Sequence, residues 1–243
     1  DSKKLFEQRE HILTITDCNK ALHKRSARYV GACGTAIADS VKIEMASTIE
    51  EKAENYATRF ICRNCSCKNG KGQEKRRFLS GVTPKGYVTL FDTAKCLCEQ
   101  IYSVTDEYYY AAGMLMESLR RCAVANGIDV ITCLNPFAPQ GLPLHIILPN
   151  EKIGFFTSNS IQNFKPIADK NINASRFTDK ETMSAYKKRL EFNKKASSQF
   201  LNEAIKLLVK AKSVHDELES YYIDAMDFEK LNRKTEGIID TVL

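Results

Sequence analysis

The chain has 243 residues, of which 43% are hydrophobic and 27% are charged, a balance typical of a soluble globular protein. No run approaches 18 consecutive apolar residues, which excludes a transmembrane helix, and the start lacks the apolar run of a secretory signal. Nine cysteines without such a signal predict free thiols in a reducing cytoplasm. Composition alone does not indicate a function. Since the chain does not begin with Met, we expect it to be a piece of a longer protein.

The net charge of +6 is unevenly distributed along the chain. Residues 1–77 hold the whole positive excess, because basic and acidic residues are equal in number over residues 78–243. The densest basic stretch, residues 68–77, has turn residues and no apolar periodicity, which predicts an exposed linker loop. It contains no aromatic side chain that would stack on bases, so we expect a solvated connector there and no nucleic-acid partner.

A CxxCxC cluster, formed by Cys62, Cys65 and Cys67, precedes this linker. Thiolates at such a spacing can share one Zn²⁺, which makes these three residues candidate metal ligands. Two more cysteines would have to complete the set, but both fall in a predicted helix, which is poor geometry for chelation: Cys96 and Cys98. Zinc binding is therefore an alternative to a simple group of reduced thiols.

The first part of the chain is predicted to be helical. Apolar residues recur at helical spacing, as in Ile37, Val41 and Met45, and two or three helices are expected before residue 62. The pattern then changes to two short β-rich runs on either side of Pro84–Gly86, which predicts a β-hairpin over residues 78–91.

The central region alternates between strand and helix patterns. Residues 100–105 predict a strand, residues 111–126 a helix closed by Gly127, and residues 129–133 another strand, which together form a βαβ unit. Two further apolar runs, residues 144–148 and 153–157, extend the sheet.

From Asp179 onward the pattern is again helical, with one long stretch and a last helix near the C-terminus. We therefore expect an α/β fold with a parallel or mixed sheet flanked by helices, preceded by a helical segment and closed by long C-terminal helices. The expected division is a helical segment over 1–67, the basic linker loop over 68–77 and the α/β module over 78–243.

Two blocks of the sequence, residues 77–88 and 211–228, resemble a little-characterised bacterial family of P-loop ATPases with two tandem P-loop-like modules. The segments Gly127–Val130, Asn135–Phe137 and His145–Pro149 fit the same pattern. The resemblance implies a P-loop NTPase-like fold. It also implies that residues 1–67 are the tail of a first module, whose own P-loop would lie upstream.

The chain departs from this family at the phosphate-binding loop itself. The family has a Gly-rich loop ending in Gly-Lys-Ser/Thr after the strand at residues 101–104, and here the loop runs from Thr105 and Asp106 through Tyr110. Ala112 stands at the position of the phosphate-binding Lys, and Gly113 at that of the Mg²⁺-binding Ser/Thr. Bulky residues disfavour the backbone geometry of a phosphate nest, and no Lys remains to neutralise phosphate charge. These five positions form a degenerate Walker A motif.

Neighbouring residues do not restore the site in the sequence. Asp106 and Glu107 are expected to repel a triphosphate at the mouth of the loop, and the run Tyr108–Tyr110 is expected to plug the vacated pocket. No carboxylate follows the apolar run at residues 153–156, so a Walker B aspartate is missing as well. His145 is expected to be a structural histidine bonded to the backbone.

These observations predict a cytoplasmic pseudo-ATPase with a structural or regulatory role and no catalytic residue in this chain. Its expected partner is an intact P-loop module in the same chain or in another subunit, and no membrane partner is expected. One alternative is an active ATPase whose intact P-loop lies upstream, in which case ATP and Mg²⁺ would be bound by that module. The other is a zinc-binding or nucleic-acid-binding protein that uses the cysteine cluster and the basic loop.

Overall fold

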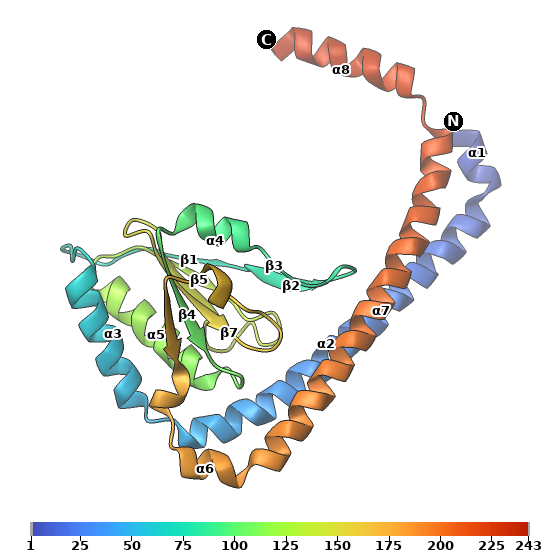
Figure 1. Ribbon diagram of the computed structural model, residues 1–243. Coiled ribbons are helices and arrows are strands. Elements are labelled where there is room, and N and C mark those ends of the chain that lie inside the picture. Colours follow the sequence, from blue (N-terminus) through green and yellow to red (C-terminus); the bar gives the residue numbers. More distant parts are fainter. Residues whose placement is uncertain (1, 243) are drawn as a thin grey trace.

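The structure is a computed structural model that describes residues 2–242. Its helices are α1 (Ser2–Glu7), α2 (Arg9–Ser47), α3 (Glu50–Asn64), α4 (Phe91–Leu97), α5 (Tyr110–Ala125), α6 (Lys180–Ala185), α7 (Lys187–Ala225) and α8 (Phe228–Val242), with short 3₁₀ turns η1 (Lys165–Ile167) and η2 (Ala174–Phe177). Its strands are β1 (Glu74–Arg77), β2 (Ser80–Thr83), β3 (Gly86–Thr89), β4 (Gln100–Thr105), β5 (Val130–Cys133), β6 (His145–Leu148), β7 (Ile153–Ser158) and β8 (Lys170–Asn173). Figure 1 shows the arrangement of these elements.

Six strands form one mixed sheet in the order β1-β5-β6-β7-β4-β8. β4 is parallel to both of its neighbours, β7 and β8, whereas β6 is antiparallel to β5 and β7. The chain leaves β4 through α5 toward β5 on one side, and it later passes from β7 to β8 on the other side. The carboxyl end of β4 is therefore a topological switch point, where open α/β sheets bind their ligands.

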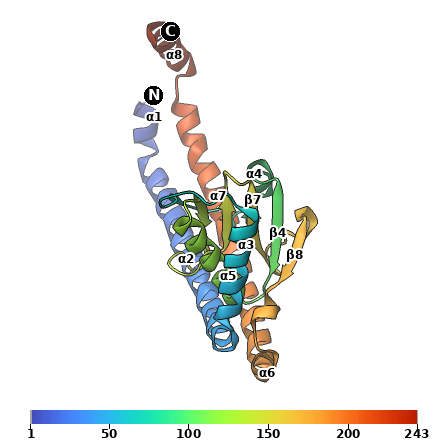
Figure 2. The same cartoon turned by 90° about the vertical axis from the view of Figure 1, so that its left-hand side faces the viewer.

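The two faces of the sheet bury two separate apolar cores. Side chains alternate along each strand, so that Tyr102 and Phe155 enter one core while Ile101 and Phe156 enter the other. The first core lies under α3 and α5, which lie together on one face in Figure 2. The second lies under α4 and η1 and includes Phe164, whose ring stacks on Phe156 at a centroid distance of 4.6 Å.

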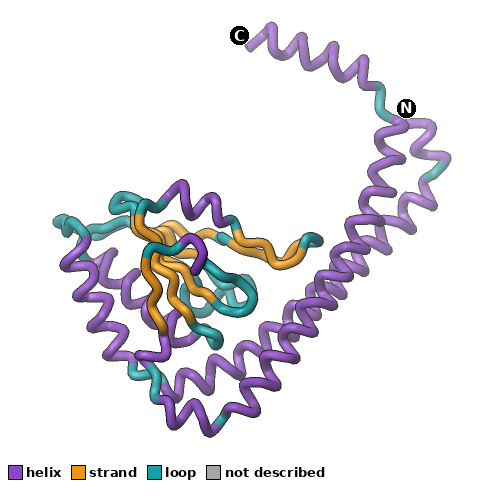
Figure 3. The backbone as a smooth tube through the Cα atoms, viewed as in Figure 1, coloured by secondary structure: helices purple, strands orange, loops and turns teal. Residues whose placement is uncertain are grey.

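The helices α2 and α7, which are far apart in the sequence, pack side by side as a long antiparallel pair beside the sheet (Figure 3). Polar side chains link the two helices along their length: Ser26 Oγ donates to the Ala204 carbonyl at 3.0 Å, and Asn19 Nδ2 donates to the Ala211 carbonyl at 2.8 Å. The β2–β3 hairpin packs on α7. The far end of the α2–α7 helix pair extends beyond the sheet toward α8.

Most of the elements expected from the sequence are present. The β-hairpin, the strand–helix–strand unit and the long C-terminal helices are confirmed, as is a mixed sheet flanked by helices. Gly127 ends α5 as expected: its φ is +72°, and a Cβ there would lie 2.6 Å from the Lys68 carbonyl oxygen. His145 is fully buried, and its Nδ1 accepts a hydrogen bond from the Thr157 amide at 3.0 Å, which confirms a structural histidine.

One expectation about the linker requires correction. Residues 68–73 form a connection without helix or strand, but residues 74–77 form the edge strand β1, parallel to β5. The four consecutive charged side chains of β1 hid this strand, because an edge strand with exposed positions tolerates charge. Two other elements, β8 and the separate short helix α6, were not expected from the sequence.

Candidate functional site

The loop between β4 and α5 lies at the carboxyl edge of the sheet, flanked by the ends of β7 and β8. Thr105 is in register with Ser158 of β7 and with Asn173 of β8, so three parallel strands end side by side. The loop then turns through Tyr109, whose φ of 76° is rare for a residue other than glycine, before α5 begins at Tyr110. This position and geometry make the loop the candidate ligand-binding site.

Asp106 folds back onto the start of α5. Its side chain is buried, with an exposed fraction of 5%. Its Oδ1 accepts a hydrogen bond from the Tyr108 amide at 2.8 Å, and its Oδ2 accepts one from the Ala112 amide at 2.8 Å. Asp106 therefore lies at the helix N-terminus, where the exposed amides and the helix dipole favour a negative group.

A second carboxyl group reaches the same amides from α2. Glu44 is 4% exposed, and its Oε2 accepts hydrogen bonds from the Tyr110 amide at 2.7 Å and the Ala111 amide at 3.3 Å. Together with Asp106 it satisfies every amide of the first turn of α5. We call these two side chains the internal carboxyl pair.

The two members of the internal carboxyl pair are also hydrogen-bonded to each other, so one of them carries a proton. Burial, reinforced by the adjacent Asp106 carboxylate, raises the pKa of Glu44 to about 9. Burial also raises the pKa of Asp106, although its hydrogen bonds from the backbone amides oppose this effect. With a pKa of about 9, Glu44 is protonated at neutral pH, and the two groups titrate as a coupled pair.

The structure brings the five expected loop positions together but gives them a different role from the one expected. Asp106 does not repel ligands at the mouth of the loop, because it points inward and caps the helix. Ala112 is completely buried, so its side chain belongs to the core. Gly113 packs against Leu142, and a Cβ at Gly113 would lie 2.9 Å from the Leu142 Cβ.

The three side chains of the run Tyr108–Tyr110 lie in different environments and do not together fill one pocket. The Tyr109 ring packs with the apolar cluster between α2 and α7. The Tyr110 hydroxyl donates to Glu50 Oε1 at 2.7 Å. Burial raises the pKa of the Tyr108 hydroxyl above its usual range. The internal carboxyl pair, and not an aromatic ring, fills the place where a phosphate would meet the helix.

A cavity of about 310 Å³ remains beside the loop. Three acidic residues line it (Glu44, Asp106 and Glu107), and Lys180 is the only basic residue in its lining. Glu107 is itself held by Lys194 Nζ at 3.0 Å and by the backbone amide of Ser160 at 3.1 Å. Glu107 is therefore paired, Glu44 and Asp106 face the amides of α5, and the cavity offers a triphosphate no cluster of cations.

The neighbouring strand β7 does not end in a carboxylate that could bind a metal ion. β7 ends at Ser158, whose Oγ lies 2.7 Å from the Ser103 Oγ and accepts a hydrogen bond from the Phe164 amide at 2.9 Å. This hydroxyl is therefore engaged within the protein.

Glu44 is the site residue that the sequence analysis missed. The predicted apolar stripe over Ile37, Val41 and Met45 is buried at Ile37 but leaves the buried face at Met45, which is 49% exposed. The buried face of α2 instead follows Cys33, Ile37, Ser40, Glu44 and Ser47. An acidic residue in phase with buried positions was the available signal.

The Sγ atoms of the three predicted zinc ligands do not all lie within 4.8 Å of one another, although Cys65 and Cys67 interact electrostatically with each other and all three do so with Cys122. Cys62 and Cys67 are exposed and Cys65 is half-buried, and burial raises the pKa of the Cys65 thiol to about 12. Among residues 2–242, one group of three metal-type ligands has all its ligand atoms within 4.8 Å, and it lies on the exposed surface of α7 without any of these cysteines: His215, Asp216 and Glu219.

Comparisons with known proteins give no further guide to this site. A scan against protein-family models, a search of curated proteins and a search of solved structures found no match to the chain. Within the described residues, no helix combines the length and the apolar character that crossing a bilayer requires.

Proposed function

We propose that this chain is a P-loop-ATPase-like module that neither binds nor hydrolyses nucleotide and that serves a structural or regulatory role. One observation carries the proposal: the amides at the start of α5, which a P-loop protein offers to phosphate, are occupied by the internal carboxyl pair. The protein thus supplies its own anionic group where a nucleotide would supply one.

A nucleotide would have to displace this pair to bind. Displacement would break the hydrogen bonds to Tyr110, Ala111 and Ala112 and would leave two buried carboxyl groups without these partners. Unsatisfied buried polar groups each cost about 1–3 kcal/mol. Phosphate gains the same amides that the carboxyl groups lose, so its net gain is small.

The groups that stabilise a transferring phosphoryl are also missing. The two positions that resemble the Lys and Ser/Thr of a P-loop hold Ala112 and Gly113, both inside the core. β7 offers the engaged hydroxyl of Ser158 in place of a Mg²⁺-binding carboxylate. Because phosphoryl transfer depends on such charges, we infer that the chain does not hydrolyse ATP.

The resemblance to a P-loop module is supported by the topology around β4. A parallel strand, a loop and a helix meet at the switch point of the sheet, which is where P-loop proteins hold phosphate. A regulatory or structural role implies a partner. We propose an intact P-loop module, in the same chain or in another subunit, and a cytoplasmic location.

Hydrogen–deuterium exchange with and without Mg·ATP tests this proposal. We expect the amides of residues 105–113 to exchange slowly in the free protein, because the internal carboxyl pair already protects them. Millimolar Mg·ATP should leave their exchange unchanged, and phosphate release should stay at the level of a protein-free control. Added protection confined to residues 105–113, or turnover above that control, would contradict the proposal.

A further inference from the structure

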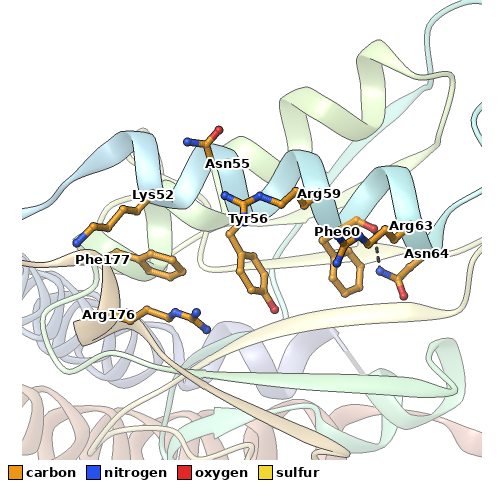
Figure 4. A pocket seen from close by; sticks show the side chains of 9 residues that line it. All are labelled: Lys52, Asn55, Tyr56, Arg59, Phe60, Arg63, Asn64, Arg176 and Phe177. Atoms are coloured by element: carbon orange, nitrogen blue, oxygen red, sulfur yellow. Dashed lines mark hydrogen bonds between the residues drawn. The ribbon is translucent and has the colours of Figure 1, made fainter.

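A large cavity lies away from the carboxyl pair, between α3 and η2. Its volume is about 650 Å³, within the range of ligand-binding sites. Four cationic side chains line it: Lys52, Arg59, Arg63 and Arg176. We call it the basic cavity, and Figure 4 shows these side chains converging from α3 and from η2.

The cations of the basic cavity are not held in close ion pairs, although the charge of Lys52 reaches the Asp179 carboxylate and helps to lower its pKa. None of its four cationic side chains forms an ion pair within the described part of the chain, and no acidic residue lines the cavity. Of the acidic residues of α3, Glu54 pairs with Arg121 and Glu50 accepts from the Tyr110 hydroxyl. Glu51 accepts from the side chain of Asn55 and is not part of the cavity lining. Unpaired guanidinium groups gathered in a concave site attract phosphate.

The cations extend farther than one phosphate group. Lys52, Arg59 and Arg63 lie on one stripe of α3, and eleven residues at 1.5 Å each separate the first from the last by about 16 Å. Each strand of a B-form duplex carries one phosphate per roughly 3.4 Å of helix axis, and an extended single strand spaces its phosphates farther apart. The stripe is therefore long enough to contact more than one phosphate of a strand.

Aromatic side chains lie among these cations. Tyr56 is half-buried and points from α3 toward Arg176, whose guanidinium carbon lies 5.6 Å from the centre of the tyrosine ring. Phe60 forms part of the floor and packs against Tyr102, and Lys170 of β8 lies over the Tyr102 ring at 5.5 Å. Tyrosine rings and guanidinium planes are the surfaces on which unpaired bases stack.

We propose that the basic cavity binds a single-stranded nucleic acid through its phosphates, with little dependence on base sequence. A single strand fits because the site is concave and offers an aromatic ring to an unpaired base, which a duplex does not expose. The site combines residues of α3 with Arg176, more than a hundred positions away in the chain. This combination of cations and aromatic rings is absent from the basic stretch at residues 68–77.

Fluorescence anisotropy with a labelled 12-nucleotide single strand of mixed sequence tests the proposal on the full chain. We expect saturable binding that weakens as salt rises, with a slope of log K against log[salt] of about −2 to −3, since roughly 0.7 per neutralised phosphate is typical of single strands. Unlabelled single strands should compete better than a duplex of equal length.

Matched charge reversals distinguish this cavity from general attraction. The double variant Arg59→Glu/Arg176→Glu should weaken binding at least tenfold. The control Lys71→Glu/Lys75→Glu changes the net charge equally but lies in the 68–77 stretch, and it should change the affinity less than twofold. Circular dichroism melting checks that both variants fold, and Arg59→Gln/Arg176→Gln replaces the first if it does not.

Four outcomes would overturn the proposal. These are no binding at 50 mM salt, equal weakening by the two double variants, stronger competition by ATP or pyrophosphate than by the strand, and stronger competition by anionic lipid vesicles. The last two would assign the cavity to a small phosphate ligand or to a membrane surface.

Discussion

At the residue scale, Glu44 and Asp106 show how a chain can fill an anion site with its own side chains. The N-terminus of α5 presents amides that need acceptors, and both carboxyl groups reach them from buried positions. Two buried carboxyl groups in contact cannot both ionise at low cost, so they share a proton. The amides are thereby satisfied without two adjacent negative charges.

The shared proton predicts a pH dependence of stability. The pKa of Glu44 is about 9 in the folded chain and about 4.3 when unfolded, so the folded state binds more protons between these values. The stabilisation associated with Glu44 is therefore complete below about pH 4.3 and is lost as pH rises toward 9. Glu44→Gln removes this titration. Its unfolding free energy relative to wild type should rise between pH 5.5 and 8.5, by about 1 kcal/mol or more.

Urea unfolding at several pH values measures this difference. The exposed Glu51, also on a helix and bonded only to the Asn55 side chain, provides a control, and Glu51→Gln should keep the wild-type pH dependence. A Glu44→Gln variant whose stability follows pH in parallel with wild type would show that Glu44 is already ionised in the fold.

At the element scale, α2 packs against both the long helix α7 and the loops at the edge of the sheet. Toward one side it pairs with α7, where Arg189 and Asn193 bind the Asp39 carboxylate. Toward the other it contacts the loop before β6 through Gly34, where a Cβ would lie 2.8 Å from the Phe137 carbonyl oxygen. The position of α2 against this loop is what allows Glu44 to reach α5.

Two glycines of α2 provide a matched test of this contact. Gly34→Ala should destabilise the protein by about 1–3 kcal/mol, because a backbone oxygen cannot easily move away from the added methyl group. Gly31→Ala, one turn earlier, meets nothing within 4 Å and should stabilise the helix by about 0.5–1 kcal/mol. Chemical denaturation measures both, and equal effects at the two positions would rule out close packing at Gly34.

At the scale of the whole molecule, α8 stands apart from the packed elements. It follows Met226–Asp227 and extends away from the α2–α7 helix pair. Its side chains are exposed over residues 228–241. Several of them are large and apolar: Phe228, Leu231, Ile238 and Ile239. These side chains therefore do not cover the cores of the sheet or of the α2–α7 helix pair.

Truncation after Asp227 tests this independence. Because α8 buries no described residue of the core, the shortened chain should melt within about 1 °C of the full chain, where 1 kcal/mol corresponds to roughly 2–4 °C. The helical signal in circular dichroism should decrease in proportion to the removed helix. A decrease of several degrees in Tm would show that α8 packs on the body in solution.

The sequence by itself determined the local elements and the absence of an intact P-loop motif after the strand at residues 100–105. Period-two and period-3.6 patterns are local properties, so the β-hairpin, the strand at residues 100–105, the helix ended by Gly127 and the long C-terminal helices were all predictable. The absence of a Lys at Ala112 was equally visible, because a motif is read from adjacent residues. The edge strand at residues 74–77 was hidden, since its charged side chains follow no apolar pattern.

Only the tertiary structure decided what fills the site and where charge gathers. Glu44 lies more than sixty residues from Asp106, and Arg176 lies more than a hundred from Arg59. Such pairs are joined by the packing of α2 on the β4–α5 loop and of η2 beside α3, which no local pattern specifies. The sequence shows that the positive excess lies in residues 1–77. Only the fold shows that Arg176 joins three cations of α3 in one cavity.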